Sequence, residues 1–170
     1  NEVSVWAQEI GYFVSRTPPT LNGQEFTGAG FGILEPLPMP GGGAGTAFDQ
    51  TKAGHGNWNE LTSSDPVAGF AFYARLLGWT KSTAMDMGPM GTYQLFAHQG
   101  RDIGGMAGLG DALASFWLPY FGVDGIDAAI GRIEAAGGRK LVGPMEVPGG
   151  AFIVVGTNPQ GAQFALVGPK

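Results

Sequence analysis

The feature that most constrains this chain is an internal repeat with a period of about 60 residues. A constant spacing of 59 residues links three pairs of positions: Asp65 with Asp124, Val67 with Ile126, and Gly78 with Gly137. A Gly-Pro-Met tripeptide also occurs twice, starting at Gly88 and again 55 residues later at Gly143. A repeat of this length is too long for a solenoid unit and favours a duplicated supersecondary module.

The first copy predicts a strand, a helix and three further strands. Asn57–Ser63 alternates in the manner of a short strand, and Ser64-Asp65-Pro66 is typical of a helix start, with Asp65 or Ser64 as the cap. Apolar residues then follow at helical spacing until Gly78 ends the helix. Three strand candidates complete the copy: Thr80–Met87, Thr92–His98 and Asp102–Leu109.

The second copy predicts the same order. Phe116–Val123 is a strand candidate, Asp124 is the expected cap of the second helix, and Gly137-Gly138 ends that helix. Three strand candidates follow: Arg139–Val142, Phe152–Val155 and Gln163–Val167. Two such modules side by side would form a half-open, eight-stranded barrel of the α+β class, with function in its concave cleft.

The two modules, at about 56–110 and 115–168, make up a predicted domain over residues 56–170. Residues 1–50 are predicted to be an extension with strand-like pieces at Ile10–Ser15 and Gly28–Leu34. After these, EPLPMPGGGAG alternates prolines and then accumulates glycines, which indicates a linker. A phosphate loop is not favoured, because no helix and no Lys-Ser/Thr pair follows the glycines.

Composition excludes several classes of function. A formal net charge of −5 argues against nucleic acid and anionic membranes as partners. The absence of cysteine excludes disulfides, thiolate metal sites and cysteine nucleophiles, and it fits a reducing compartment. No apolar run approaches the roughly 20 residues of a membrane span. We therefore expect a cytoplasmic protein.

Three short sequences mark defined points of the repeated plan. WNELTSSD from Trp58 and WLPYF from Trp117 begin the two copies, and NPQGAQF from Asn158 precedes the last strand. The first two are similar to the opening strands of the vicinal oxygen chelate superfamily, which includes glyoxalases, bleomycin-resistance proteins and dioxygenases. The third resembles the DPxGNxF-type turn before the last strand, with Asn in place of Asp. The resemblance covers the repeat region and implies the paired βαβββ fold.

Metal-dependent members of that superfamily hold a divalent ion with His, Gln or Glu side chains from strands of both modules. The corresponding opening-strand positions here are Trp58 and about Leu118, and the closing strands offer Ile103–Ala107 and Phe164–Leu166. Neither closing-strand tract contains a His or Glu, indole and aliphatic side chains cannot ligate a divalent cation, and Gln163 is the only polar candidate. We therefore predict no metal and no cofactor.

Strand alternation predicts that Trp58 and Glu60 face the cleft while Leu61 faces the helix. In an aromatic-walled cleft, Glu60 could act as a base or bind a cationic group of a ligand. Alternatively, Glu60 has a structural role, hydrogen-bonded to the backbone or to Arg101 across the barrel. Both interpretations remain open from the sequence.

The same alternation sends Tyr120 inward, and Tyr93 is also predicted to face the cleft. With Trp58 and Trp117, these tyrosines would form an aromatic wall suited to a flat or apolar small molecule. Ordinary filling of a small barrel explains the same residues equally well. The predicted ligand-binding set is therefore Trp58, Glu60, Tyr93, Trp117 and Tyr120, with Glu60 as the one candidate catalytic residue.

Three functions are consistent with these patterns. The leading prediction is a metal-free protein that binds a small apolar or aromatic molecule, as drug-sequestering members of the superfamily do, often with the cleft shared across a homodimer. The second is a lyase, isomerase or dioxygenase-like enzyme with an atypical metal site or none, acting through Glu60. The third is a structural or protein-interaction role.

Overall fold

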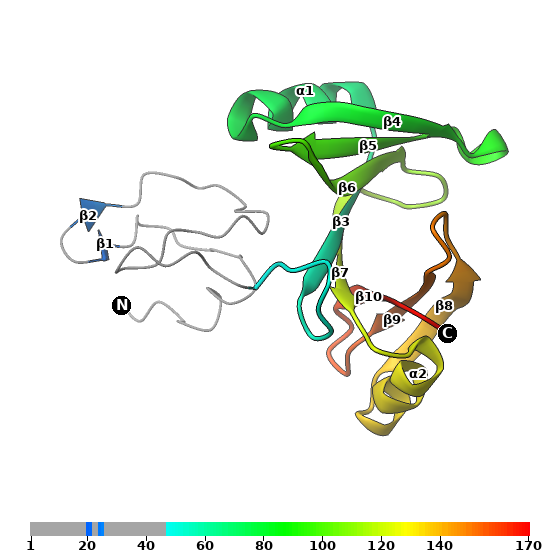
Figure 1. Cartoon of the computed structure of the whole chain (residues 1–170). Coiled ribbons are helices and arrows are strands. Elements are labelled where there is room, and N and C mark those ends of the chain that lie inside the picture. The colour runs from blue at the N-terminus through cyan, green and yellow to red at the C-terminus, as the bar shows by residue number, and fades with distance from the viewer. Residues whose placement is uncertain (1–19, 22–23, 26–46) are drawn as a thin grey trace. The chain divides into compact units, whose positions relative to one another are not determined.

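The computed structural model describes residues 20–21, 24–25 and 47–170 (Figure 1). The chain divides into two compact units, residues 1–49 and residues 50–170. The second unit contains the whole repeat. Within the described residues, no helix is long and apolar enough to cross a membrane.

In the first unit, β1 (Thr20–Leu21) pairs antiparallel with β2 (Gln24–Glu25). The strand-like pieces predicted at Ile10–Ser15 and Gly28–Leu34 lie outside the described residues, as does the predicted linker.

The second unit consists of two βαβββ modules. The first module contains β3 (Gly56–Ser63), α1 (Pro66–Leu77), β4 (Thr80–Asp86), the short 3₁₀ helix η2 (Gly88–Met90), β5 (Thr92–His98) and β6 (Arg101–Gly108). The second module contains β7 (Phe116–Gly122), α2 (Ile126–Ala135), β8 (Arg139–Glu146), β9 (Phe152–Thr157) and β10 (Gln163–Gly168). Every strand and helix predicted for the repeat is present.

All eight strands of the second unit belong to one sheet, in the order β4-β5-β6-β3-β7-β10-β9-β8. The modules join at its centre, where β3 and β7 pair antiparallel, while β3–β6 and β7–β10 are parallel pairs. The sheet curves so that the β4–β5 and β8–β9 hairpins form two arms facing each other (Figure 1). Strands β4 and β8 are its two free edges, so the barrel is half-open and α+β, as predicted.

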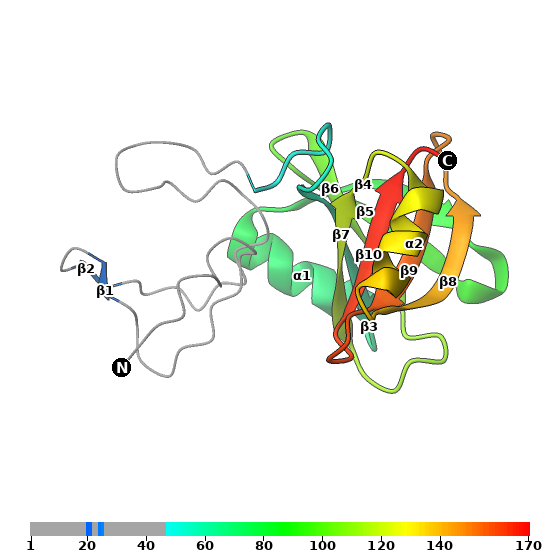
Figure 2. The same cartoon turned by 90° about the horizontal axis from the view of Figure 1, so that it is seen from below.

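The helices lie on the convex face of the sheet, and Figure 2 shows α2 lying over β9 and β10. Helix α1 begins and ends as predicted: Asp65 accepts a hydrogen bond from the Ala68 backbone N at 2.9 Å, and Gly78 adopts a left-handed φ of 72°. The predicted cap of α2 is wrong. Gly125 precedes the first helical residue, so Asp124 lies one position too early to cap.

Strand β8 is longer than predicted, because it continues past Val142 through Pro144 to Glu146. Proline lacks the backbone N–H that a central strand needs. Since β8 is an edge strand, this missing donor need not remove a ladder hydrogen bond.

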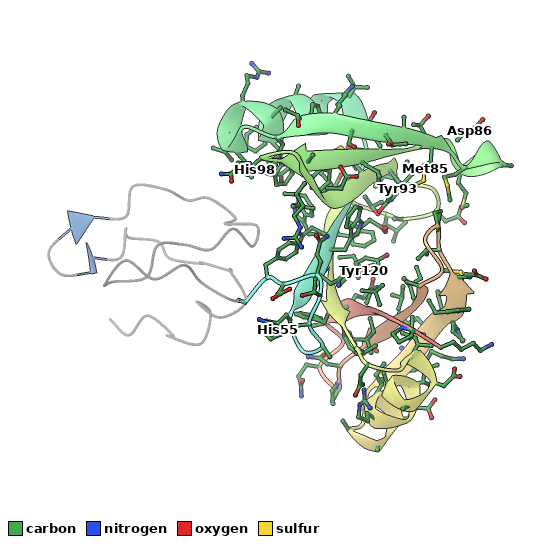
Figure 3. All side chains as sticks on the ribbon, in the orientation of Figure 1. His55, Met85, Asp86, Tyr93, His98 and Tyr120 are labelled. Carbon is green, nitrogen blue, oxygen red and sulfur yellow. The ribbon has the colours of Figure 1, made fainter. Side chains whose placement is uncertain are left out.

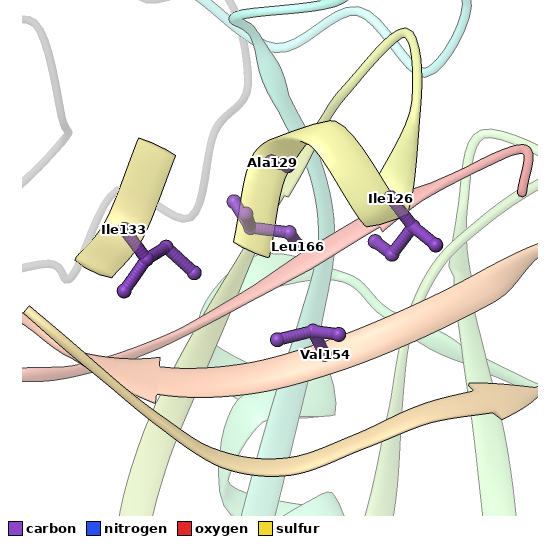
Figure 4. Close-up of a cluster of buried hydrophobic side chains, with 5 residues drawn as sticks. All are labelled: Ile126, Ala129, Ile133, Val154 and Leu166. Atoms are coloured by element: carbon purple, nitrogen blue, oxygen red, sulfur yellow. The ribbon is translucent and has the colours of Figure 1, made fainter. Parts of the chain in front are cut away.

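The core of the second module lies between α2 and the sheet. Three helix side chains, Ile126, Ala129 and Ile133, pack against Val154 and Leu166 (Figure 4). Ile126 and Val154 are completely buried. Burial of one such aliphatic side chain contributes about 1.5–3 kcal/mol, so this cluster fixes α2 to the convex face.

Two consecutive glycines in β6 allow an aromatic ring to lie against each face of the sheet. A Cβ at Gly104 would overlap the Phe96 ring on the convex face. A Cβ at Gly105 would overlap the Tyr93 ring on the concave face. Consecutive residues of a strand point to opposite faces, so the glycine pair makes room for both rings.

Candidate functional site

The floor of the concave face is built where the two modules meet. In the antiparallel pairing of β3 with β7, Trp58 lies opposite Tyr120 and Glu60 lies opposite Leu118. Directly opposite residues share one face of a sheet. Leu61 points the other way and lies beside Gly69 of α1, so alternation correctly predicts that Glu60 faces inward.

A hydrogen-bond network joins four of the predicted site residues. The Tyr93 hydroxyl donates to Glu60 Oε2 at 3.0 Å, and the Tyr120 hydroxyl donates to the same oxygen at 3.1 Å. The Trp58 indole N–H in turn donates to the Tyr93 hydroxyl oxygen at 3.0 Å. Figure 3 shows Tyr93 and Tyr120 on the inner side of the curved sheet. We call these four residues the floor network.

Burial raises the pKa of the Tyr93 phenol well above its usual range, and the negative charge of Glu60 raises it further. The same two causes, in the same order, raise the pKa of Tyr120. Both phenols therefore keep their protons at neutral pH and serve as hydrogen-bond donors. Glu60 Oε2 is the acceptor that they share.

The second oxygen of Glu60 is in a different situation. Among the residues that the structure describes, no side chain donates to Oε1 and no Lys, Arg or His forms an ion pair with Glu60. Glu60 is partly buried. The site thus presents a carboxylate that is held through one oxygen, while its other oxygen has no donor among the described residues.

Trp117 does not belong to the floor network. It precedes the inward-facing Leu118, so it points to the convex face, where its indole N–H donates to the Tyr73 hydroxyl at 3.1 Å. There it joins an aromatic cluster in which Trp79 stacks on Phe96 with ring centroids 4.3 Å apart. The same alternation that places Tyr120 inward, applied strictly, assigns Trp117 to this outer face.

Arg101 is not the partner of Glu60, contrary to the structural alternative drawn from the sequence. Its guanidinium Nε donates to Gln50 Oε1 at 2.6 Å. The Gln50 side-chain amide in turn donates to the Asp102 backbone oxygen at 3.1 Å. Arg101 therefore helps to hold the segment that precedes β3. The hydrogen-bond partners of Glu60 are tyrosine hydroxyls instead of Arg101.

Apolar side chains line the two arms above the floor network. Met85 lies opposite Tyr93 on β4, and on the other arm Val142 and Met145 of β8 lie opposite Val155 and Ile153. Val155 and Ile153 pack against the concave-face cluster of Leu118, Tyr120 and Ala165. Val142 and Met145 are each 45% exposed, so each arm presents a flexible apolar surface to the concave side.

Similarity to known proteins extends over about two thirds of the chain. Over 124 residues the chain is 33% identical to the anthracycline biosynthesis protein DnrV of Streptomyces peucetius, covering 64% of this chain and 45% of that protein. Over 113 residues it is 32% identical to CFP32 of Mycobacterium tuberculosis, provisionally named a glyoxylase. This match covers 66% of this chain and 43% of CFP32. The chain thus spans less than half the length of these relatives. No family model matches it.

Two solved structures share the fold. Methylmalonyl-CoA epimerase of Mycobacterium tuberculosis superposes with a TM-score of 0.53 at 15% identity, covering 69% of this chain and 89% of the epimerase. A variant of the Streptomyces coelicolor methylmalonyl-CoA epimerase, in complex with 2-nitronate-propionyl-CoA, superposes with a TM-score of 0.50 at 16% identity. This match covers 69% of this chain and 96% of the epimerase. These relatives and the shared fold bear out the resemblance to the vicinal oxygen chelate superfamily.

The metal site of this superfamily requires donor side chains on the inner faces of strands from both modules. Here the inner faces of the four middle strands present Trp58, Gly105, Leu118 and Ala165 beside Glu60. Indole, aliphatic and glycine positions offer no ligand to a divalent cation. Within the described part of the chain, no three His, Asp or Glu side chains come together as a metal centre. The residues present do not fit the metal.

A second concavity lies away from the floor network. It is an open depression of about 550 Å³ near the end of β7 and the start of α2, with Phe121, Asp124 and Arg132 in its lining. Its only charged pair is exposed, with Arg132 Nη2 3.4 Å from Asp124 Oδ1. Exposed pairs of this kind interact weakly, so we locate the candidate site at the floor network instead.

Proposed function

We propose that this protein binds a small apolar or aromatic molecule on its concave face, without a metal ion, in the manner of drug-sequestering members of the superfamily. The observation that carries this proposal is the floor network. It places two phenols and an indole around one carboxylate, on a face where the described residues provide no cluster of metal-ligating side chains.

Shape and chemistry support an aromatic ligand. The floor network keeps the polar ends of three aromatic rings hydrogen-bonded. Trp58 and Tyr93 are partly exposed and offer apolar ring surface to a ligand, whereas Tyr120 is buried. The arms add apolar side chains, among them methionines that adapt to ligand shape. One relative, DnrV, is named for the biosynthesis of anthracyclines, which contain fused aromatic rings.

Metal content tests the first half of the proposal. Purified protein should contain no stoichiometric transition metal, and titration with Ni²⁺, Zn²⁺, Mn²⁺ or Fe²⁺ should give no saturable heat in calorimetry. The physical reason is the absence of donor side chains at the strand positions described above. One tightly bound ion per chain would contradict the proposal.

Binding of naphthalene probes tests the second half. Calorimetry with 1-naphthylmethanol should show saturable binding that Tyr93→Leu weakens, because the phenol ring forms part of the floor. Tyr73→Leu is the matched control, since Tyr73 belongs to the aromatic cluster on the convex face. Equal loss in both variants would place the binding site elsewhere.

The alternative is an enzyme of the same superfamily, and one observation favours it. Glu60 combines an available carboxylate oxygen with two neutral phenol donors, an arrangement suited to removing a proton next to a carbonyl. Glu60 would take the proton through Oε1, while the two phenols, which donate to Oε2, would hold the carboxylate in position. Deuterium exchange from D₂O into simple ketones and thioesters, followed by NMR and abolished by Glu60→Gln, would support this enzyme.

A further inference from the structure

The carboxylate of Glu60 is strongly asymmetric. Both tyrosine hydroxyls donate to Oε2, and no described residue donates to Oε1. A carboxylate has about four acceptor positions, and two bonds on one oxygen leave the other oxygen with its full capacity. The Trp58 indole N–H donates to the Tyr93 hydroxyl and so fixes its position. Because Tyr93 is fixed in this way, the Glu60 carboxylate is not free to rotate toward new donors.

The charge of Glu60 has no compensating cation among the described residues. Its immediate neighbours on the concave face are Trp58, Leu118 and the two tyrosines. A partly buried charge is costly unless it is paired, and two neutral hydroxyls offset only part of that cost. The missing partner would have to come from outside the floor network.

We propose that the ligand of the concave face carries a protonated amine that binds Oε1 of Glu60, with an adjoining apolar or aromatic body against Tyr93 and the arms. This inference rests on the proposed function and specifies its ligand class. A cationic N–H donor forms a charge-assisted hydrogen bond, about twice as strong as a neutral one. The aromatic rings beside it add cation–π attraction. An acidic ligand is excluded, because its charge would repel Glu60.

Three naphthalene probes of matched size separate these possibilities. They are 1-naphthylmethylamine, which is a cation at neutral pH, the neutral 1-naphthylmethanol, and the anionic 1-naphthylacetate. We expect the amine to bind at least about tenfold more tightly than the alcohol, and the acetate to bind most weakly. The preference for the amine should shrink as ionic strength rises, since salt screens the interaction.

Glu60→Gln is the decisive variant. The Gln side chain keeps an acceptor for both tyrosine hydroxyls but removes the charge, so the preference for amine over alcohol should fall to about twofold or less while the alcohol still binds. Glu134→Gln is the matched control. It removes the same charge from the exposed surface of α2 and should leave the tenfold preference intact. Circular dichroism melting confirms that both variants are folded.

The outcomes distinguish this inference from the proposed function. If alcohol and amine bind equally well to the wild type, or if Glu60→Gln leaves the preference unchanged, the amine inference is wrong and the binding function stands. If no probe binds to the folded wild type, both are wrong. A preference for the amine that disappears only in Glu60→Gln supports both.

Discussion

The two modules of this protein share one plan but hold their helices in different ways. Helix α2 buries three aliphatic residues against the sheet, and charged residues stand in its first and last turns. Helix α1 has no fully buried residue and carries a single charge, Arg75. Its apolar side chains continue onto the outer surface, where Val67, Phe72 and Leu76 are 73%, 57% and 51% exposed.

The aromatic cluster on the convex face explains how α1 is held nonetheless. Tyr73 stacks on Trp79, which follows the helix, and contacts Trp117 of the second module edge-on. One tyrosine thus ties α1 to both modules, where α2 relies on several aliphatic contacts. The lesson is that a duplicated βαβββ plan constrains the position of a helix but leaves its packing chemistry open.

The largest expected difference between the helices concerns stability. Ile126→Ala should lower the free energy of unfolding by about 3 kcal/mol, because the Ile126 side chain of α2 is completely buried against the sheet. Leu76→Ala on the outer face of α1 should cost less than about 1 kcal/mol. Urea denaturation followed by circular dichroism measures both. Equal losses would mean that the two helices pack alike and would contradict the difference described between α1 and α2.

The two faces of β6 provide the next test. Gly105→Ala should lower the free energy of unfolding by about 1–3 kcal/mol, because the new Cβ meets the Tyr93 ring. Adding Tyr93→Ala removes the obstacle, so the double variant should lose clearly less than the sum of the two single variants. A double-mutant cycle in urea measures this coupling, and strict additivity would contradict the close approach.

Alkaline pH should expose a property of the concave face alone. The pKa of Tyr93 and of Tyr120 is raised in the folded state above the unfolded value of about 10. The contribution of each tyrosine to the free energy of unfolding is therefore fully present below pH 10. Above pH 10 it decreases by up to about 1.4 kcal/mol per pH unit for each tyrosine. Tyr93→Phe with Tyr120→Phe should flatten this decline. Urea midpoints between pH 8 and 11 measure it, and an unchanged slope would count against buried, neutral phenols.

The smallest expected effect compares the two helix starts. Asp65→Ala should cost about 1 kcal/mol, because its carboxylate caps α1. Asp124→Ala should cost less than about 0.5 kcal/mol, because Asp124 only faces Arg132 in an exposed pair. Thermal melts of both variants suffice. A larger loss at Asp124 would restore it as the cap that the repeat predicts.

Several properties of this protein follow from the sequence alone. The repeat, the order of its strands and helices, and the cap and end of α1 are local patterns, because hydrogen bonds within one turn and side-chain alternation depend on neighbouring residues. Alternation also assigns Glu60 to the concave face and Leu61 to the helix face. The superfamily resemblance that rests on these patterns is confirmed by the relatives and by the fold.

Other properties were decided only by the tertiary structure. Nothing local shows that hydroxyls from β5 and β7 meet on one oxygen of Glu60, because that depends on the register between strands of different modules. The partner of Arg101, the length of β8 at a free edge and the shift of the α2 cap depend likewise on which strands and turns become neighbours. Local periodicity chooses the face of each side chain, and long-range pairing chooses what that side chain touches.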